Sequence, residues 1–147
     1  MNKYILLDFD GVLTSVAHTW RCRMAHRQPN IYELDWFDPT SLEALETIVN
    51  ETGAGIVVSS DWRYLGDEVL EKVWKQTPTP GMFMGTTPVW IPTKKAAIEA
   101  WIRSHPDDRY VILDDATLRL PNHVKTNPDM GLTMKKALEA INVLSEN

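Results

Sequence analysis

Three short, continuous apolar runs in the sequence each end at a polar residue. They are residues 4–7 before Asp8, residues 56–58 before Ser59, and residues 110–113 before Asp114. An unbroken apolar run of this length is typical of a strand buried on both faces, as strands of a parallel sheet are. Two shorter apolar runs, 82–84 and 123–125, are weaker strand candidates that the pattern alone does not separate from loops.

Four helical patterns lie between and after these runs. In the first, Asp38 is the expected N-cap and Pro39 the first helical residue. Apolar residues at helical spacing predict a second helix over 65–74, a third through 98–102 and a fourth that begins at Thr133. Strands that alternate with such helices predict an α/β fold, namely a Rossmann-like, three-layer α/β/α sandwich with a mostly parallel central sheet.

Length and composition fit one folded domain. The chain has 147 residues, of which 44% are apolar and 24% charged, close to the average for a globular protein. We therefore expect a single domain over residues 1–147. Residues 12–37 follow neither helical nor strand periodicity, and we expect them to form a small insertion or active-site flap.

Charge and cysteine content exclude several classes of protein. The formal net charge of −5 argues against a protein that holds long nucleic acid through nonspecific electrostatics. The single cysteine, Cys22, excludes an intramolecular disulfide and a multi-cysteine zinc site. The apolar run at 4–7 is too short for the core of a signal peptide or a membrane span. We expect a cytoplasmic protein with no membrane contact and no obligate protein partner.

The polar residues that end the buried strands are the first candidates for a functional site. In an open parallel sheet the ligand lies outside the carboxyl ends of the strands, so Asp8, Ser59 and Asp114 should converge. Asp10 and Asp115 follow closely in the sequence, which brings up to four carboxylates into one crevice. Carboxylates at close range repel one another unless a cation offsets their charge. Oxygen ligands favour Mg²⁺ over zinc, so the pattern predicts a magnesium site.

The stretch DFDGVLT, residues 8–14, resembles the DxDGT/V signature of the haloacid dehalogenase (HAD) superfamily. The other motifs of that superfamily have matching residues in the expected order. These are Ser59 after the second buried strand, Lys94 or Lys95 at the start of a later helix, and the pair Asp114-Asp115 after a further strand.

The resemblance implies a magnesium-dependent phosphatase. It implies that Asp8 is the nucleophile that forms an aspartyl-phosphate, and that Asp10 protonates the leaving oxygen and later activates water. Asp8, the backbone carbonyl of Asp10, and the pair Asp114 and Asp115 would hold the metal ion. Ser59 would donate a hydrogen bond to a phosphoryl oxygen.

The resemblance also implies a lysine that contacts both the phosphate and the nucleophile. Lys94 is preferred because it lies four residues before the apolar Ile98, which places it at the start of the helix with its amine turned toward the strand ends. Lys95 would point in another direction.

Further stretches of the sequence resemble one subgroup of the HAD superfamily. SSDWR at 59–63 and the segments 110–120 and 124–133 are similar to small HAD domains of nucleic-acid end-repair proteins, which have a minimal cap or none. This implies an open site that takes either a phosphorylated small molecule or a nucleic-acid end. Ser60 and Arg63 are then candidates for binding substrate phosphate.

A basic and aromatic group adds candidates for substrate contacts. Its members are Arg21, Arg23 and Arg27, which are suited to further phosphates, and Trp20 or Trp62, suited to stacking on a base. The same residues also fit a solvated face with the tryptophans packed in the core.

Two other functions use similar residues. A phosphoacceptor receiver domain also gathers carboxylates, a Ser or Thr and a Lys around Mg²⁺, but it places its acidic pair early in the chain and the phosphorylated Asp later. A phospho-binding regulatory domain without turnover would keep the fold but have no phosphatase activity. The lifetime of the aspartyl-phosphate separates both alternatives from a phosphatase.

Overall fold

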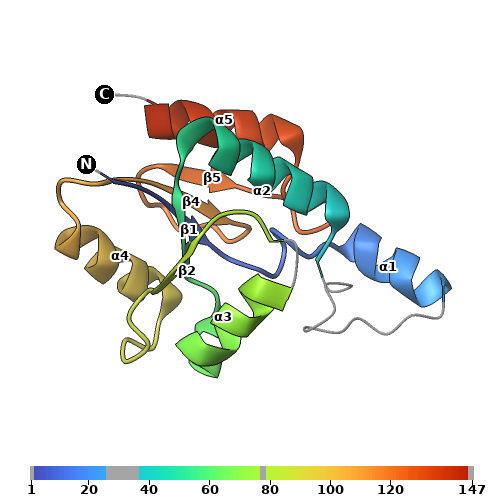
Figure 1. Ribbon diagram of the computed structural model, residues 1–147, viewed down its shortest axis with the longest axis horizontal. Coiled ribbons are helices and arrows are strands. Elements are labelled where there is room, and N and C mark those ends of the chain that lie inside the picture. The colour runs from blue at the N-terminus through green and yellow to red at the C-terminus, as the bar shows by residue number, and fades with distance from the viewer. Residues whose placement is uncertain (1, 26–36, 77–78, 146–147) are drawn as a thin grey trace.

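The computed structural model describes residues 2–25, 37–76 and 79–145. Over these residues five parallel strands form one sheet in the order β3-β2-β1-β4-β5 (Figure 1). The strands are β1 (Lys3–Leu7), β2 (Gly55–Val58), β3 (Phe83–Thr86), β4 (Arg109–Asp114) and β5 (His123–Lys125). Both weaker strand candidates are therefore strands, and the predicted Rossmann-like α/β fold is confirmed.

The helices connect the strands and cover the sheet. They are α1 (Val16–Met24), α2 (Pro39–Thr52), α3 (Asp67–Gln76), α4 (Lys94–Ser104) and α5 (Met134–Ser145), with a 3₁₀ helix η1 (Asp61–Leu65). α2 is capped as the sequence predicts, because the Asp38 side chain accepts a hydrogen bond from the Thr40 N–H at 2.9 Å. The helix predicted from Leu65 instead begins at Asp67, since Gly66, with φ +92°, separates η1 from α3.

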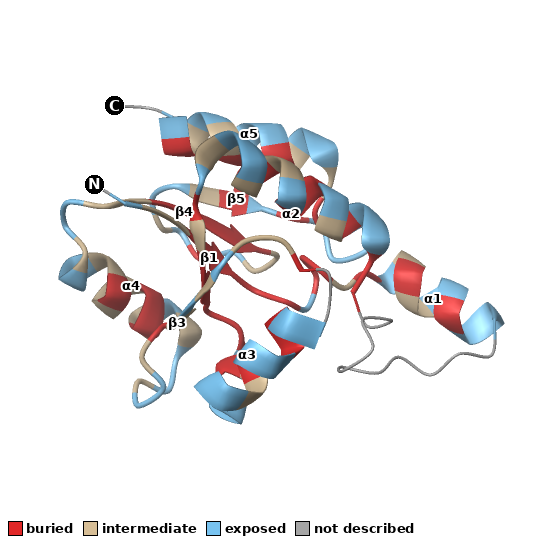
Figure 2. Cartoon of the chain, viewed as in Figure 1, coloured by how far each residue is buried: buried red, intermediate tan, exposed pale blue. Residues whose placement is uncertain are grey.

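Side chains alternate between the two faces of the sheet and build two buried clusters. On one face Ile5 and Leu7 of β1 pack in a cluster with residues of α2, α3 and α5. On the other face Leu6 packs with Ile98 and Trp101 of α4. Figure 2 shows the buried strands between helices whose outer sides are exposed. Burial on both faces explains why the central strands are continuous apolar runs.

The segment 12–37 contains a helix that its sequence pattern does not predict. Only two of the nine residues of α1, His18 and Cys22, are buried, and one of them is polar. A buried stripe this narrow gives no apolar periodicity in the sequence. Residues 26–36 of the predicted insertion or flap, including Arg27, lie outside the described residues.

No helix in the described ranges combines the length and the apolar character that crossing a membrane would require.

Candidate active site

The sheet register brings three predicted site residues side by side. Asp8 and Ser59 directly follow β1 and β2, and Asp114 is the last residue of β4. The parallel ladder continues past the strand ends, because the Ser59 N–H donates to the Leu7 carbonyl at 2.9 Å and the Asp8 N–H donates to the Leu113 carbonyl at 3.0 Å. All three site residues are buried. Their convergence follows from strand pairing alone.

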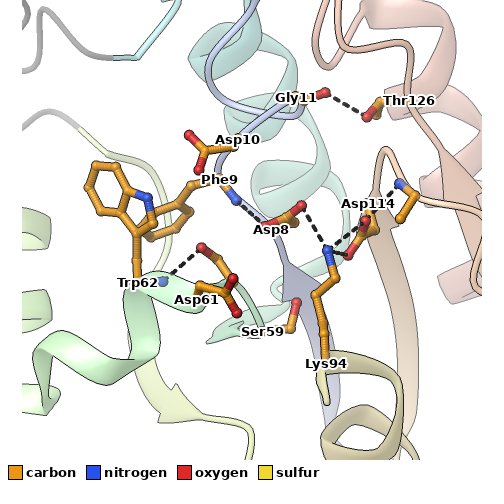
Figure 3. Close-up of polar contacts among 12 residues, drawn as sticks. Asp8, Phe9, Asp10, Gly11, Ser59, Asp61, Trp62, Lys94, Asp114 and Thr126 are labelled. Carbon is orange, nitrogen blue, oxygen red and sulfur yellow. Dashed lines mark hydrogen bonds and ion pairs between the residues drawn. The ribbon is translucent and has the colours of Figure 1, made fainter. Parts of the chain in front are cut away.

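Lys94, the first residue of α4, points into this group. Its Nζ lies 3.3 Å from Oδ2 of Asp8, and 3.1 and 2.9 Å from Oδ1 and Oδ2 of Asp114 (Figure 3). The N-cap residue Thr93 holds the start of the helix, since its side chain accepts a hydrogen bond from the Ala96 N–H at 3.3 Å. Lys95 is exposed. The structure thus places the ammonium of Lys94 against two carboxylates.

Burial and crowding control the charges of this group. Burial raises the pKa of Asp8 from 3.8 to about 7, with Asp114 adding to the increase and Lys94 opposing it. For Lys94, burial alone would lower the pKa, but the charges of Asp8 and Asp114 outweigh it and raise the pKa. The ammonium is therefore firmly charged, while a complete set of ionised carboxylates is unfavourable without more positive charge.

Asp115 reaches the group because Gly11 has no side chain. Gly11 adopts φ +81°, in the left-handed region, and a Cβ at this position would overlap the carboxylate of Asp115. The Gly11 carbonyl accepts a hydrogen bond from Oγ1 of Thr126 at 2.7 Å, which fixes the loop after β1 to the end of β5 (Figure 3). The glycine of the DFDGVLT stretch is thus required for a close approach.

Asp8, Asp114 and Asp115 form a group that fits a hard divalent cation. Each offers one carboxylate oxygen, and these atoms all lie within 4.8 Å of one another. Oδ2 of Asp114 accepts no hydrogen bond from the described part of the chain, although it lies close to the Lys94 ammonium. Oxygen ligands with excess negative charge suit Mg²⁺. The carboxylate of Asp10 is outside this group.

Asp10 lies at the exposed rim of the site. Its carboxylate points away from Asp8 (Figure 3), and its Oδ1 accepts a hydrogen bond from the Thr14 hydroxyl at 3.5 Å. The Thr14 hydroxyl in turn accepts one from the Gly11 N–H at 3.2 Å. An accessible carboxylate beside a buried one has room to exchange protons with a substrate or with water.

The two serines after β2 have different environments. The Ser59 side chain is fully buried, and its Oγ has no hydrogen-bond partner among the described residues. The Ser60 hydroxyl accepts a hydrogen bond from the Trp62 N–H at 3.0 Å and so caps η1. A buried polar atom without a partner is costly, which makes Ser59 the serine with a hydroxyl available to a ligand.

The side chain of Arg63, in η1, is fully buried. Its NH1 donates to the carbonyls of Ser59 and Ser60 at 3.4 and 3.3 Å, and its NH2 donates to the Ile91 carbonyl at 3.3 Å. It therefore joins the loop after β2 to the segment that leads into α4. Substrate binding by Ser60 and Arg63 stays a prediction.

The basic and aromatic candidates divide between packing and exposure. Trp62 packs edge-to-face on Phe9, with ring centroids 4.9 Å apart. Arg21 pairs with Asp38 at 3.1 Å. Trp20 and Arg23 are exposed on α1.

Three polar residues near the site were not predicted. Thr126 and Thr87 follow β5 and β3, and the buried Thr87 hydroxyl has no partner in the described ranges. His123 Nε2 donates to the Asp114 carbonyl at 3.0 Å. The strand-end rule that finds Asp8 also leads to Thr126, which directly follows the run 123–125. It does not lead to Thr87, because β3 continues past the run 82–84 to Thr86.

Comparison with known proteins agrees with this geometry. A family model described as "HAD domain in Swiss Army Knife RNA repair proteins" matches residues 4–137. Neither a search of curated proteins nor a search of solved structures gave a match. The matched range contains every site residue discussed above and all residues of the five strands except Lys3. The chain therefore belongs to the family of HAD domains found in Swiss Army Knife RNA repair proteins.

Proposed function

We propose that this chain is a magnesium-dependent phosphomonoesterase that transfers the terminal phosphoryl group of an RNA end to Asp8 and then to water. The observation that carries the proposal is the Lys94 ammonium held between Asp8 and Asp114, at 3.3 and 2.9 Å. A carboxylate attacks a phosphate dianion only where nearby positive charge offsets the repulsion.

The first half of the reaction transfers phosphorus to the protein. A carboxylate oxygen of Asp8 forms a bond to phosphorus while the bond from phosphorus to the ester oxygen breaks. Asp10, exposed at the rim, donates a proton to the departing oxygen. The unpartnered hydroxyl of Ser59 donates to a phosphoryl oxygen, and Lys94 offsets its charge.

The second half releases phosphate. Asp10 removes a proton from a water molecule, which attacks the aspartyl-phosphate and frees the Asp8 carboxylate. When bound by Asp8, Asp114, Asp115 and the Asp10 carbonyl, Mg²⁺ supplies the positive charge that the crowded carboxylates and the phosphate require.

The choice of an RNA end rests on two further features. The family description refers to RNA repair proteins. Asp10 is exposed, so a bulky leaving group on its side meets no cap among the described residues. An open site suits the end of a polymer because no lid has to close around it.

The test is Mg²⁺-dependent release of phosphate from short RNA oligonucleotides that carry a 5′- or a 3′-phosphate, compared with sugar phosphates. We expect turnover on an RNA end, with Asp8→Asn inactive and no turnover in EDTA. Equal rates for wild type and Asp8→Asn would refute the nucleophile. A stable aspartyl-phosphate without turnover would instead favour a receiver or phospho-binding domain, and a preference for sugar phosphates would refute the RNA substrate.

Asp10→Asn tests the acid-base role. We expect kcat to fall by roughly 10²- to 10⁴-fold, the usual contribution of general acid-base catalysis. Asp107→Asn is the matched control, because Asp107 is an exposed aspartate outside the carboxylate group. A near-wild-type rate for Asp10→Asn would remove Asp10 from the mechanism.

A further inference from the structure

A groove of about 360 Å³ opens beside Asp10, and Lys94 is not among the described residues that line it. Asp10, Gly11 and Asp115 form its inner wall, so it is continuous with the carboxylate group. Trp20 and Arg23 of α1 form its outer wall. Because Asp10 is the proposed proton donor to the leaving oxygen, the leaving group of the substrate has to lie on this side.

The outer wall carries two side chains suited to nucleic acid. Trp20 is 58% exposed, and the Arg23 guanidinium lies 5.8 Å from the centroid of its ring. Among the described residues, Arg23 pairs with no carboxylate, whereas its neighbour Arg21 pairs with Asp38. An exposed aromatic ring beside a guanidinium can stack on a base and contact a phosphate at once.

α1 is held against the active-site loops, so this wall has a fixed position. The N–H groups of Val16 and Ala17 donate to the Pro128 and Asp129 carbonyls at 3.1 and 3.2 Å. The N-cap residue Ser15 accepts a hydrogen bond from the His18 N–H. Its hydroxyl also donates to Asp38, the N-cap of α2, at 3.0 Å. The helix is thus tied both to the segment after β5 and to α2.

The other tryptophan near the site is less available. Trp62 contacts both Phe9 and Phe37, with ring centroids 4.9 and 6.0 Å away, and packs against the core. Trp20 is therefore the aromatic residue that the groove presents to a ligand.

We infer that the Trp20–Arg23 face of α1 binds the terminal nucleoside of the RNA end, with the base stacked on Trp20 and the next phosphate paired with Arg23. This inference rests on the proposed function and names its leaving-group site. Stacking tolerates any base, so the site recognises an end without reading its sequence. A phosphopeptide would use the carboxylate group but would have no base for Trp20.

Binding to a catalytically silent protein tests the site without turnover. The probes are 5′-phosphorylated and 3′-phosphorylated RNA tetranucleotides, each labelled with fluorescein at the other end, titrated with Asp8→Asn protein and followed by anisotropy. Adding Trp20→Ala should weaken binding about 10- to 100-fold. Trp20→Phe in place of Trp20→Ala should lose less affinity, because the aromatic ring is kept. Adding Arg23→Gln should reduce the slope of log Kd against log salt by about 0.7, as expected for one phosphate contact on a single strand.

Two exposed residues away from the groove give matched controls. Trp90 is 79% exposed and Arg103 is exposed on α4, and neither lines the groove. We expect Trp90→Ala and Arg103→Gln to bind both probes as the parent does. Equal losses in the Trp20 and Trp90 variants would overturn the inference. If Trp20→Ala fails to fold, Trp20→Phe and Arg23→Gln decide, and parental binding by both would overturn it.

Turnover separates failure of the inference from failure of the proposed function. In the active protein, Trp20→Ala should lower kcat/KM for the RNA end relative to glycerol 2-phosphate by at least about 10-fold. An unchanged ratio overturns the inference alone. If the wild-type protein hydrolyses none of the substrates but RNA binding still depends on Trp20, the proposed hydrolase is refuted and the nucleoside site stands. Tighter binding of a fluorescein-labelled phosphoserine peptide than of either RNA probe overturns the nucleoside assignment.

Discussion

Asp8 occupies a position where its own charge is unfavourable until a cation arrives. Burial and the nearby Asp114 raise its pKa to about 7, and the single ammonium of Lys94 offsets this only in part. The same excess of negative charge that makes the metal-free site unfavourable provides the attraction for a divalent ion. Stability and metal binding are therefore opposed at this residue.

Asp8→Asn should therefore stabilise the metal-free protein in a pH-dependent way. The folded state keeps the Asp8 proton up to about pH 7, whereas the unfolded chain releases it near 3.8, so ionisation reduces folding stability as pH rises between these values. The free energy of unfolding of Asp8→Asn should exceed that of wild type by about 1–3 kcal/mol at about pH 8 and by little at about pH 4. Urea denaturation in EDTA measures both, and a difference that is constant with pH would show that ionisation of Asp8 is not the cause.

Gly11→Ala tests the close approach of Asp115. An alanine at φ +81° is strained, and its Cβ would displace the Asp115 carboxylate. We expect a loss of about 1–2 kcal/mol in stability and a Mg²⁺ affinity lower by about 10-fold. Gly53→Ala is a matched control, because Gly53 has φ +70° and no atom lies within 4 Å of the place that its Cβ would occupy. Gly53→Ala should lose stability but keep the wild-type Mg²⁺ affinity, measured by calorimetry. Equal Mg²⁺ affinities in the Gly11→Ala and Gly53→Ala variants would show that the close approach of Gly11 to Asp115 does not matter for metal binding.

At the scale of the elements, Arg63 couples η1 to the start of α4. Arg63→Met would leave the carbonyls of Ser59, Ser60 and Ile91 without their donor in a buried place. We expect the free energy of unfolding to fall by about 3 kcal/mol, with Arg63→Lys intermediate because a lysine lacks the planar fork. Thermal and urea unfolding measure the free energy of unfolding of each variant. Arg103→Met, a change at an exposed arginine, is the control. Wild-type stability of Arg63→Met would show that these hydrogen bonds contribute little.

The elements differ in how well a sequence can predict them. β1, β2 and β4 are buried on both faces and so appear as apolar runs, and the residues that follow them predict where the site lies. α1 buries only His18 and Cys22, which leaves no periodic signal. The burial of Arg63 was equally hidden, because three of its five acceptors are backbone carbonyls that no side-chain pattern reveals; the other two are the Asp61 carboxylate and the Tyr64 hydroxyl.

For the molecule as a whole, one edge of the sheet collects a polar residue from every strand. In chain order these are Asp8, Ser59, Thr87, Asp114 and Thr126. Lys94 and Asp115 complete the group from α4 and from the loop after β4. Since the contributing residues span most of the chain, the site exists only when the sheet and α4 are assembled. A ligand of this site therefore binds the folded state alone.

Mg²⁺ should consequently stabilise the entire fold. At about 100 times its Kd the ion adds about 2.7 kcal/mol, or roughly 5–10 °C in Tm for a chain of this size. Calorimetric scans with MgCl₂, compared with NaCl at equal ionic strength, separate this from charge screening. Asp115→Asn should lose most of the shift because it removes one of the grouped oxygens. Asp107→Asn, at an exposed position outside that group, should keep it, and an equal shift in both variants would place the ion elsewhere.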